Sequence, residues 1–210
     1  TGPTFSDVPA EHWAQYEIEG LYALGIVGHC ATSPLRYCPE DQLTRAGAAL
    51  YILRAKYDGT YTPPLPANQR FADVPTSHSL YRWIEQFAAD GITSGCGGGN
   101  FCPDQAVTRI QFLIFLMRAK YGSAYTPPTV GAGEHFFADM NGHWAEAWAV
   151  DAYKKGFVTG CSGGNFCPDN NITRAMVAVL LEKVFQKVAA PPLTVPLQEP
   201  VITQTYNYYP

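Results

Sequence analysis

Phe5-Ser-Asp7-Val-Pro9 recurs in this chain as Phe71-Ala-Asp73-Val-Pro75 and again as Phe137-Ala-Asp139-Met140. The step from the first aspartate to the second is 66 residues, and the step from the second to the third is also 66. Self-similarity at a fixed period of this length is typical of chains built from one repeated supersecondary unit. The sequence therefore predicts three copies of such a unit, called copy one, copy two and copy three below in chain order.

Each copy opens with a stretch that predicts a first helix. In copy one the apolar residues Ile18, Leu21 and Tyr22 follow the aspartate at helical spacing. Each stretch ends in a glycine that can adopt the left-handed conformation closing a helix. These glycines are Gly25, Gly91 and Gly156.

A cysteine loop follows the first helix in every copy, and copy two shows it as Gly95-Cys-Gly-Gly-Gly-Asn-Phe-Cys-Pro-Asp104. The six cysteines fall into the local pairs Cys30 with Cys38, Cys96 with Cys102, and Cys161 with Cys167. Five or seven intervening residues suit a small disulfide-closed loop better than a zinc site, which prefers closer pairs. Buried free thiols are a further alternative. Disulfides in every copy indicate an oxidising compartment outside the cytoplasm.

A second helix is predicted after each cysteine loop. Thr44, Thr108 and Thr173 suit the N-cap position, where a hydroxyl accepts from an unpaired first-turn amide. The runs that follow are apolar nearly all round, which indicates packing at the centre of the molecule. These runs are Ala48 to Leu53, Phe112 to Met117 and Val177 to Val184.

The composition limits the function. The 210 residues are 47% hydrophobic and 15% charged, with a formal net charge of −4. Such a chain buries a sizeable core and has no extended basic stripe for nucleic acid. We expect no membrane span, because no apolar run approaches about 20 residues, and no cofactor or metal, because the known catalytic and ligand motifs are missing. The predicted protein is secreted and not an enzyme, and a basic, apolar leader does not open the sequence.

The motifs Phe-x-Asp-Val-Pro, His-Trp-Ala, Gly-Ile-x-x-Gly, Phe-x-Pro-Asp and Thr-Arg-Ala together resemble S-layer homology repeats, from residue 5 to about residue 187. The resemblance implies a mainly α fold, a pseudo-threefold trefoil around a central three-helix bundle, displayed on a bacterial cell surface. It also implies non-covalent docking onto pyruvylated cell-wall polysaccharide. The copies then span residues 1–60, 61–126 and 127–190, and residues 191–210 form an extended tail rich in Pro and Tyr.

The resemblance carries a glycan-binding role onto the arginines Arg45, Arg109 and Arg174 of the Thr-Arg elements. A guanidinium beside helix N-terminal amides is a sensible anion site. The alternative is architectural, with each arginine in a salt bridge to Asp7, Asp73 or Asp139, which are included in the candidate site. The family's glutamate in this element is replaced by Gly47, Gln111 and Met176, and of these only Gln111 could close a capping box with its threonine.

Aromatic and histidine side chains ahead of the first helices are further candidates. Trp13 and Trp144 could stack on sugar rings, as could Trp148, although aromatic residues of an amphipathic helix are more often core. His12, His78 and His143 recur at aligned positions, which favours a capping or packing role over a metal site.

The C-terminal tail, Val201-Ile-Thr-Gln-Thr-Tyr-Asn-Tyr-Tyr209, has strong β propensity and no charge. A lone strand needs a partner, which is either its own molecule or a neighbouring subunit. The predicted assembly residues are Val201, Ile202, Tyr206, Tyr208 and Tyr209.

Three functional hypotheses follow. The leading one is a cell-surface structural protein that docks onto acidic cell-wall polysaccharide. The alternative is a self-assembling filament or lattice subunit, a homopolymer joined through the tail and suggested by the lack of a cargo domain in these residues. The third is an accessory module of an enzyme.

Overall fold

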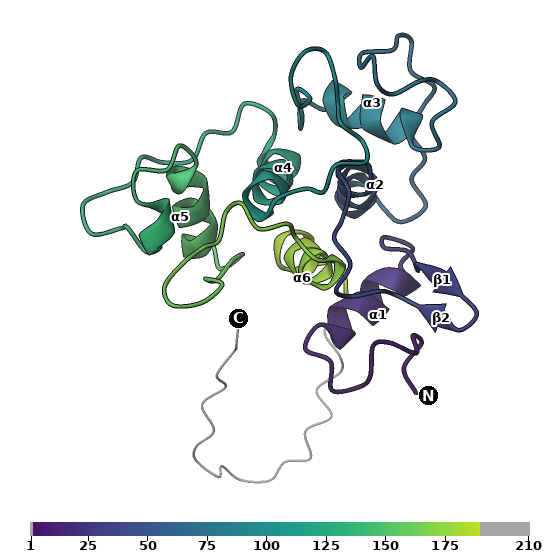
Figure 1. The fold of residues 1–210 in the computed structure, drawn as a ribbon, viewed down its shortest axis with the longest axis horizontal. Helices are drawn as coiled ribbons and strands as arrows, with labels where there is room; N and C mark the ends of the chain where they lie inside the picture. The colour runs from purple at the N-terminus through teal and green to yellow at the C-terminus, as the bar shows by residue number, and fades with distance from the viewer. Residues whose placement is uncertain (1, 190–210) are drawn as a thin grey trace.

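The computed structural model describes residues 2–189, and this range is mainly helical (Figure 1). The predicted tail and its assembly residues Val201, Ile202, Tyr206, Tyr208 and Tyr209 lie outside the described residues. The α-helices are α1 (Gln15–Ala23), α2 (Arg45–Lys56), α3 (Tyr81–Ala89), α4 (Arg109–Tyr121), α5 (Glu146–Lys154) and α6 (Arg174–Phe185). The two short strands β1 (Ala31–Thr32) and β2 (Leu35–Arg36) pair antiparallel, and η1 (Ala138–Met140) is a 3-10 turn.

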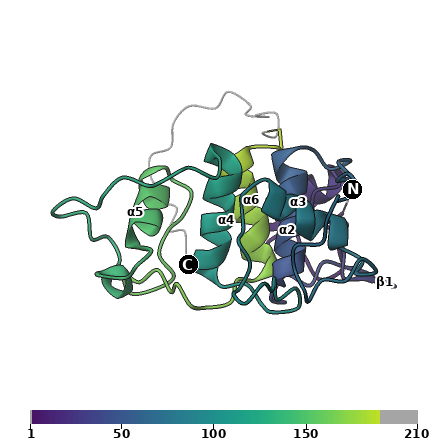
Figure 2. The same cartoon turned by 90° about the horizontal axis from the view of Figure 1, so that it is seen from above.

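The second helices of the copies, α2, α4 and α6, lie at the centre and contact one another. Figure 2 shows α4, α6 and α2 side by side, with α5 to one side of them. Their residues are buried on most sides: Phe112, Leu113, Leu116 and Met117 of α4 all have no exposed surface. Three apolar helices can pack in this way because each offers more than one buried face.

The first helices α1, α3 and α5 lie outside this centre, and each packs on the central helix of the preceding copy. The helix α3 of copy two packs on α2, α5 packs on α4, and α1 packs on α6 (Figure 1). The three pairs define lobe one (α1 with α6), lobe two (α3 with α2) and lobe three (α5 with α4). The chain therefore closes on itself, because the first helix of copy one completes the lobe that copy three begins.

A ring of backbone hydrogen bonds joins the copies just before the central helices. The amide of Leu43 donates to the carbonyl of Ile172 at 3.1 Å, Val107 donates to Leu43 at 3.0 Å, and Ile172 donates to Val107 at 3.0 Å. All three side chains are buried. Each of the three residues thus donates its amide and accepts at its carbonyl within the ring, so these backbone groups have hydrogen-bond partners at the centre of the fold.

The predicted helix signals are confirmed. The hydroxyl oxygens of Thr44, Thr108 and Thr173 accept from the third residue of their helices, and Gln111 closes the one capping box of the three. The glycines after α1, α3 and α5 have φ values of 72°, 70° and 73°, as a left-handed C-terminal residue requires. The central helices begin at the predicted arginines and run past the predicted apolar runs. No helix of residues 2–189 has the length and apolar character needed to cross a bilayer.

The predicted disulfides are formed within each copy, as Cys30–Cys38, Cys96–Cys102 and Cys161–Cys167. The zinc and free-thiol alternatives are therefore excluded for these cysteines. Two linkers between copies share the sequence Tyr-Thr-Pro-Pro, at residues 61–64 and 125–128, and both have no regular secondary structure. The first tyrosine of each linker stacks on a tyrosine just before it. The ring centroids of Tyr61 and Tyr57 are 4.2 Å apart, and those of Tyr125 and Tyr121 are 4.7 Å apart.

Candidate functional site

The three aspartates each hold the cysteine loop of their own copy. Both carboxylate oxygens of Asp73 accept backbone amides, from Phe101 at 2.8 Å and from Cys102 at 2.7 Å. Asp7 and Asp139 do the same for the corresponding residues of copies one and three. The second cysteine of each loop has positive φ, near 60°, an uncommon conformation for a residue other than glycine. The carboxylates stabilise these turns, and their oxygens are already occupied by protein donors.

The three arginines reach across copies into these loops. Arg45 Nε donates to the carbonyl of Phe101 at 2.8 Å, and Arg174 Nε donates to the carbonyl of Tyr37 at 2.8 Å. The guanidinium carbons lie over aromatic rings, 5.0 Å from Phe101 for Arg45 and 4.6 Å from Tyr37 for Arg174. Arg109 lies in the same way over Phe166, at 4.8 Å. The arginines therefore help join one copy to the next through carbonyls and aromatic rings.

The expected architectural salt bridges between these arginines and the aspartates are not formed within residues 2–189. The expected anion site at the helix N-termini is also corrected. The amides of Arg45 and Ala46 donate to the carbonyls of Gln105 and Pro103, and the third amide of the helix donates to Thr44. Copies two and three repeat this pattern. Because neighbouring loops use the first-turn amides, any anion must be bound by side chains.

The outer nitrogens of the three guanidinium groups differ. Nη1 and Nη2 of Arg174 donate to the hydroxyl of Tyr51 at 3.0 Å and to the carbonyl of Gly28 at 2.5 Å. Nη2 of Arg109 donates to the carbonyl of Thr159 at 2.7 Å. Nη2 of Arg45 is buried and has no hydrogen-bond partner. A buried donor without a partner is costly, and such groups call for an explanation.

Arg45 lines a cleft of about 180 Å³ between lobe two and lobe three. One wall is the loop after α3, and the floor is a stripe of α4 running from Gln111 to Arg118. The other wall carries Trp144 and Trp148. The lining residues are Arg45, Thr93, Ser94, Gly95, Gln111, Ile114, Phe115, Arg118, Trp144 and Trp148.

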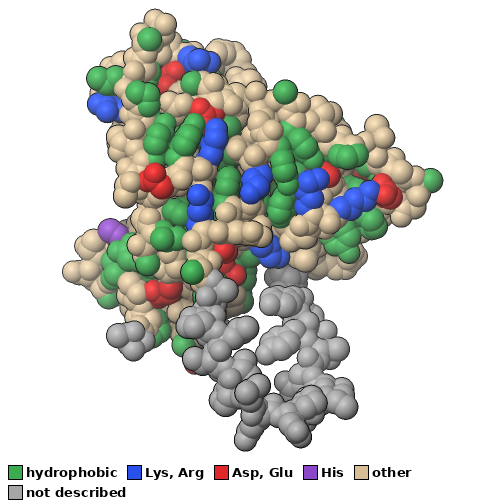
Figure 3. Space-filling view, turned by 180° about the vertical axis from the view of Figure 1, so that it is seen from behind, with side chains coloured by type: hydrophobic (Ala, Val, Ile, Leu, Met, Phe, Trp, Pro, Cys, Tyr) green, Lys and Arg blue, Asp and Glu red, His purple; other side chains and the backbone are tan. Residues whose placement is uncertain are grey.

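The cleft carries uncompensated positive charge. Two guanidinium groups line it, no lining residue is acidic, and neither Arg45 nor Arg118 forms an ion pair within residues 2–189. Burial lowers the pKa of the Arg45 guanidinium, and the negative charge of Asp73 raises it. The ordinary pKa of arginine is so high that the side chain stays protonated. Figure 3 shows basic side chains in a row among hydrophobic ones across one face of the molecule. The cleft is therefore suited to a small anion.

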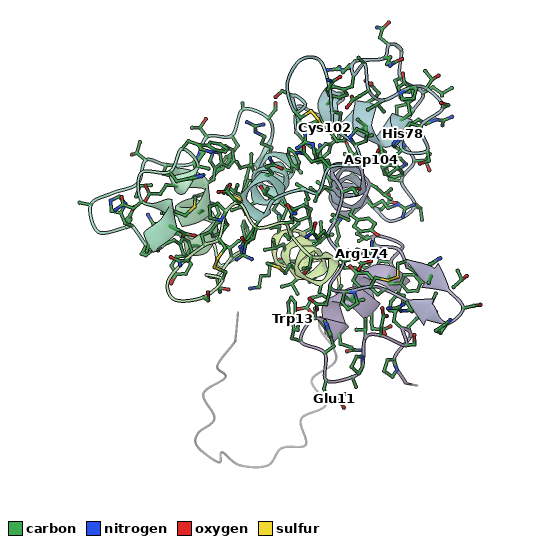
Figure 4. All side chains as sticks on the ribbon, viewed as in Figure 1. Glu11, Trp13, His78, Cys102, Asp104 and Arg174 are labelled. Carbon is green, nitrogen blue, oxygen red and sulfur yellow. A yellow bond between two sulfur atoms is a disulfide. The ribbon has the colours of Figure 1, made fainter. Side chains whose placement is uncertain are left out.

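The two tryptophans ahead of the first helices are exposed, which corrects the expectation that they are core. The exposed fraction is 59% for Trp13 and 73% for Trp144, whereas Trp148 is partly buried. The reason is that α1 and α5 begin only at Gln15 and Glu146, so Trp13 (Figure 4) and Trp144 lie before the amphipathic face. Their rings remain open to a ligand.

The sequence interpretation missed Arg118. It stands nine residues after Arg109, and the apolar run that precedes it drew attention to the core instead. Its guanidinium donates to the carbonyl of Ile92 at 3.4 Å and lies 5.7 Å from the ring of Trp148. A basic residue in the last turn is favoured by the helix dipole, so its position alone does not distinguish a ligand site from a helix end.

The histidines bond to the backbone just ahead of the first helices, although no side chain caps the first turn of α1, α3 or α5. In each copy Nδ1 accepts from the backbone amide two residues on, at 3.2 Å for His12, 3.0 Å for His78 and 3.2 Å for His143. The described residues hold one group with metal-ligand spacing, Asp7 with Cys30 and Cys38, but its sulfurs are bonded to each other. A larger hollow of about 520 Å³ lies between residues 65–69 and α3, and its one basic residue, Arg82, is exposed.

Comparison with known proteins adds to this geometry. The family model described as "S-layer homology domain" matches residues 70–113 and 136–176, which lie in copies two and three. The chain is 30% identical to an S-layer protein of Bacillus licheniformis over 90% of this chain and 21% of that protein. It is 29% identical to an amylopullulanase of Thermoanaerobacterium thermosulfurigenes, over 88% of this chain and 10% of that protein. It is also 24% identical to a cellulosome-anchoring protein of Acetivibrio thermocellus, over 71% of this chain and 33% of that protein. The chain thus spans a third or less of the length of each of these relatives.

Proposed function

This chain belongs to the S-layer homology domain family and acts at the bacterial cell surface, and we propose that it anchors there by docking non-covalently onto an acidic cell-wall polysaccharide. The relatives include an S-layer protein, an enzyme and an anchoring protein, which have the matched segment in common. A segment found in proteins with such different names suits attachment better than catalysis. The proposed role is therefore non-catalytic.

The observation that carries this proposal is the cleft between lobe two and lobe three. A sugar carboxylate can accept from Arg45 and Arg118, and charge-assisted hydrogen bonds of this kind are the stronger ones in proteins. The exposed ring of Trp144 offers a flat apolar surface for a sugar ring. The volume of about 180 Å³ is below the roughly 300–1,000 Å³ of pockets for drug-sized ligands, so the cleft suits a single sugar residue of a longer chain.

The proposal includes the architecture that the family resemblance implies. We treat copy one as a third S-layer homology repeat, equivalent to copies two and three, because its aspartate, disulfide loop, threonine cap and arginine make matching contacts. The three central helices then form the central three-helix bundle of a pseudo-threefold trefoil. Loop placement by the aspartates and the cross-copy arginines supports this equivalence.

Sedimentation with purified wall polysaccharide tests the function. We expect the chain to co-sediment with an acidic wall polysaccharide, and to lose most of that binding when mild acid removes pyruvate ketal groups from the polymer. Arg118→Ala should weaken binding about tenfold, the scale of one hydrogen bond to a charged group. Lys120→Ala is the matched control, because Lys120 is exposed in the same last turn of α4 and does not line the cleft.

The readout separates binding from folding, since both variants should melt close to the parent protein. Failure of the parent protein to sediment with any acidic wall polysaccharide would contradict the proposed function. Equal binding to the ketal-free polymer would contradict the assignment of a carboxylate ligand.

A further inference from the structure

We propose that the three clefts related by the repeat are not equivalent, and that the cleft between lobe two and lobe three is the single site for an acidic sugar residue in this chain. This inference rests on the proposed function and restricts it to one ligand per molecule. The central helices differ at three positions when the copies are aligned at their Thr-Arg elements. These positions hold Gly47, Gln111 and Met176, then Tyr51, Phe115 and Leu180, then Arg54, Arg118 and Lys183.

The cleft between lobe one and lobe two is closed by Tyr51 of α2. The hydroxyl of Tyr51 accepts from Nη1 of Arg174 at 3.0 Å and from the amide of Gly28 at 3.2 Å. With the carbonyls of Tyr37 and Gly28, it completes the hydrogen bonding of the Arg174 guanidinium at Nε, Nη1 and Nη2. Phe115 stands at the equivalent place in the open cleft and has no hydroxyl. At this cleft Arg174 therefore joins lobe one to lobe two through its bond to Tyr51.

The cleft between lobe three and lobe one suits an acid less well. The outer Nη2 of Arg109 is held by the carbonyl of Thr159, so the buried nitrogen of this guanidinium that is left without a partner is the inner Nε. The aligned floor residues are Met176 and Leu180, which offer no amide or aromatic ring. At the position of Trp148, the third residue after the helix N-cap, copy one has Glu17, whose negative charge repels a carboxylate.

The open cleft differs from the other two in its free outer donor and in its floor. Nη2 of Arg45 is without a partner although the residue is only 3% exposed. Arg118 adds a second guanidinium, whose counterpart in the cleft between lobe one and lobe two is Arg54. The amide of Gln111 lines the floor, and Trp144 lies at the rim with 73% of its surface exposed. The ligand class is a sugar residue bearing one carboxylate. Its carboxylate would satisfy the buried donor of Arg45, and its ring would stack on Trp144.

Titration calorimetry with a small probe tests this inference. The probe is a methyl mannoside carrying a 4,6-pyruvate ketal, and the matched ligand control is the same mannoside without the ketal. We expect one probe molecule to bind per chain and the ketal-free sugar to bind at least tenfold more weakly. Trp144→Ala should lower affinity about tenfold, on the scale of one aromatic stacking contact. Trp13→Ala should bind like the parent protein, because its aligned cleft is the one that carries Glu17.

The two variants should affect folding equally, because both side chains are exposed and both precede a first helix. Both also follow a histidine whose ring accepts from the amide two residues on. A stoichiometry of two or three, or equal losses in the two variants, would overturn the single-site inference while leaving polysaccharide docking in place. Absence of probe binding, in a protein that still sediments with the acidic polysaccharide, would also overturn it. Loss of both kinds of binding would instead count against the proposed function itself.

Discussion

At the scale of single residues, Asp7 both holds the cysteine loop of its copy and pairs with a basic side chain. Asp7 accepts from the amides of Tyr37 and Cys38 at 2.8 Å each and lies 3.4 Å from Nε of Arg36. Burial raises the pKa of the Asp7 carboxyl, but these two amides and Arg36 outweigh burial, so the net pKa lies below its ordinary value of 3.8. The carboxylate form is therefore favoured by folding.

This pKa shift makes a prediction about acid stability. Because the folded-state pKa is depressed, the stability that Asp7 contributes is present above about pH 4 and is lost as the pH falls through the folded-state pKa. Asp7→Asn should lower the free energy of unfolding at pH 7 by about 1–3 kcal/mol, because an amide side chain supplies one acceptor for two buried amides. The gap between variant and parent in urea unfolding should narrow toward pH 3.

The control for this experiment is Asp41→Asn, since Asp41 is exposed in the same copy and bonds through its backbone, with its amide donating to Cys38 and its carbonyl accepting from the amide of Arg174. A gap for Asp7→Asn that stays constant from pH 7 to pH 3 would show that the carboxylate charge has no part in holding the loop.

Residue roles were also the part of the site that the sequence predicted least well. The arginine positions are predictable because the Thr-Arg element is repeated in every copy, and the threonine caps follow from local backbone chemistry. The exposure of Trp144 and the free nitrogen of Arg45 depend on contacts between copies. Such contacts join residues far apart in the chain, as in the bond from Arg45 to Phe101, and periodicity within one copy does not show them.

At the scale of elements, the central helices differ in how their first turns are closed. Thr108 and Gln111 form a reciprocal capping box, with the hydroxyl of Thr108 accepting at 3.4 Å and the Gln111 amide oxygen accepting at 3.3 Å. Helices α2 and α6 have only the threonine half, because Gly47 and Met176 carry no acceptor. The sequence predicted this difference, since capping depends on residues three apart in one segment.

The capping box of α4 predicts a measurable loss of stability when the hydroxyl of Thr108 is removed. Thr108→Ala should lower the free energy of unfolding by about 1 kcal/mol, a typical cost for losing an N-cap, and the melting temperature by about 2–4 °C in a chain of this size. Thr126→Ala is the control, because Thr126 is an exposed residue of the following linker. Differential scanning calorimetry of both variants measures the effect, and equal melting temperatures would contradict the cap's contribution.

At the scale of the whole molecule, the order of the helices along the chain could be predicted from the sequence. Which helices pack against one another could not. Two helices per copy, their caps and the glycines after them follow from repeating local signals. The packing of α1 on α6 pairs the first helix of the chain with the last, which no local pattern indicates. Each copy thus lacks a complete core of its own and takes part of it from a neighbour.

Because α1 of copy one packs on α6 of copy three, a destabilising substitution in α1 should loosen α6. Leu21 of α1 is fully buried, and Leu21→Ala should cost about 2–5 kcal/mol. Hydrogen exchange should speed up more for amides of α6 than for those of α2, although α2 is the next helix in the chain. Leu24→Ala, which truncates a side chain that is 45% exposed at the end of the same helix, should leave both unchanged. Faster exchange mainly in α2 would contradict the exchanged packing.

The backbone ring through Leu43, Val107 and Ile172 bears on how a gene of this kind can be lengthened by duplication of its repeats. Every amide and every carbonyl of the ring is already matched, one from each copy. A tandem duplication that adds a single copy inserts an amide and a carbonyl with no place in a ring of three, and both would be left to solvent or to a strained opening. Duplication of all three copies together would supply three more amides and three more carbonyls, which could close a second complete ring beside the first.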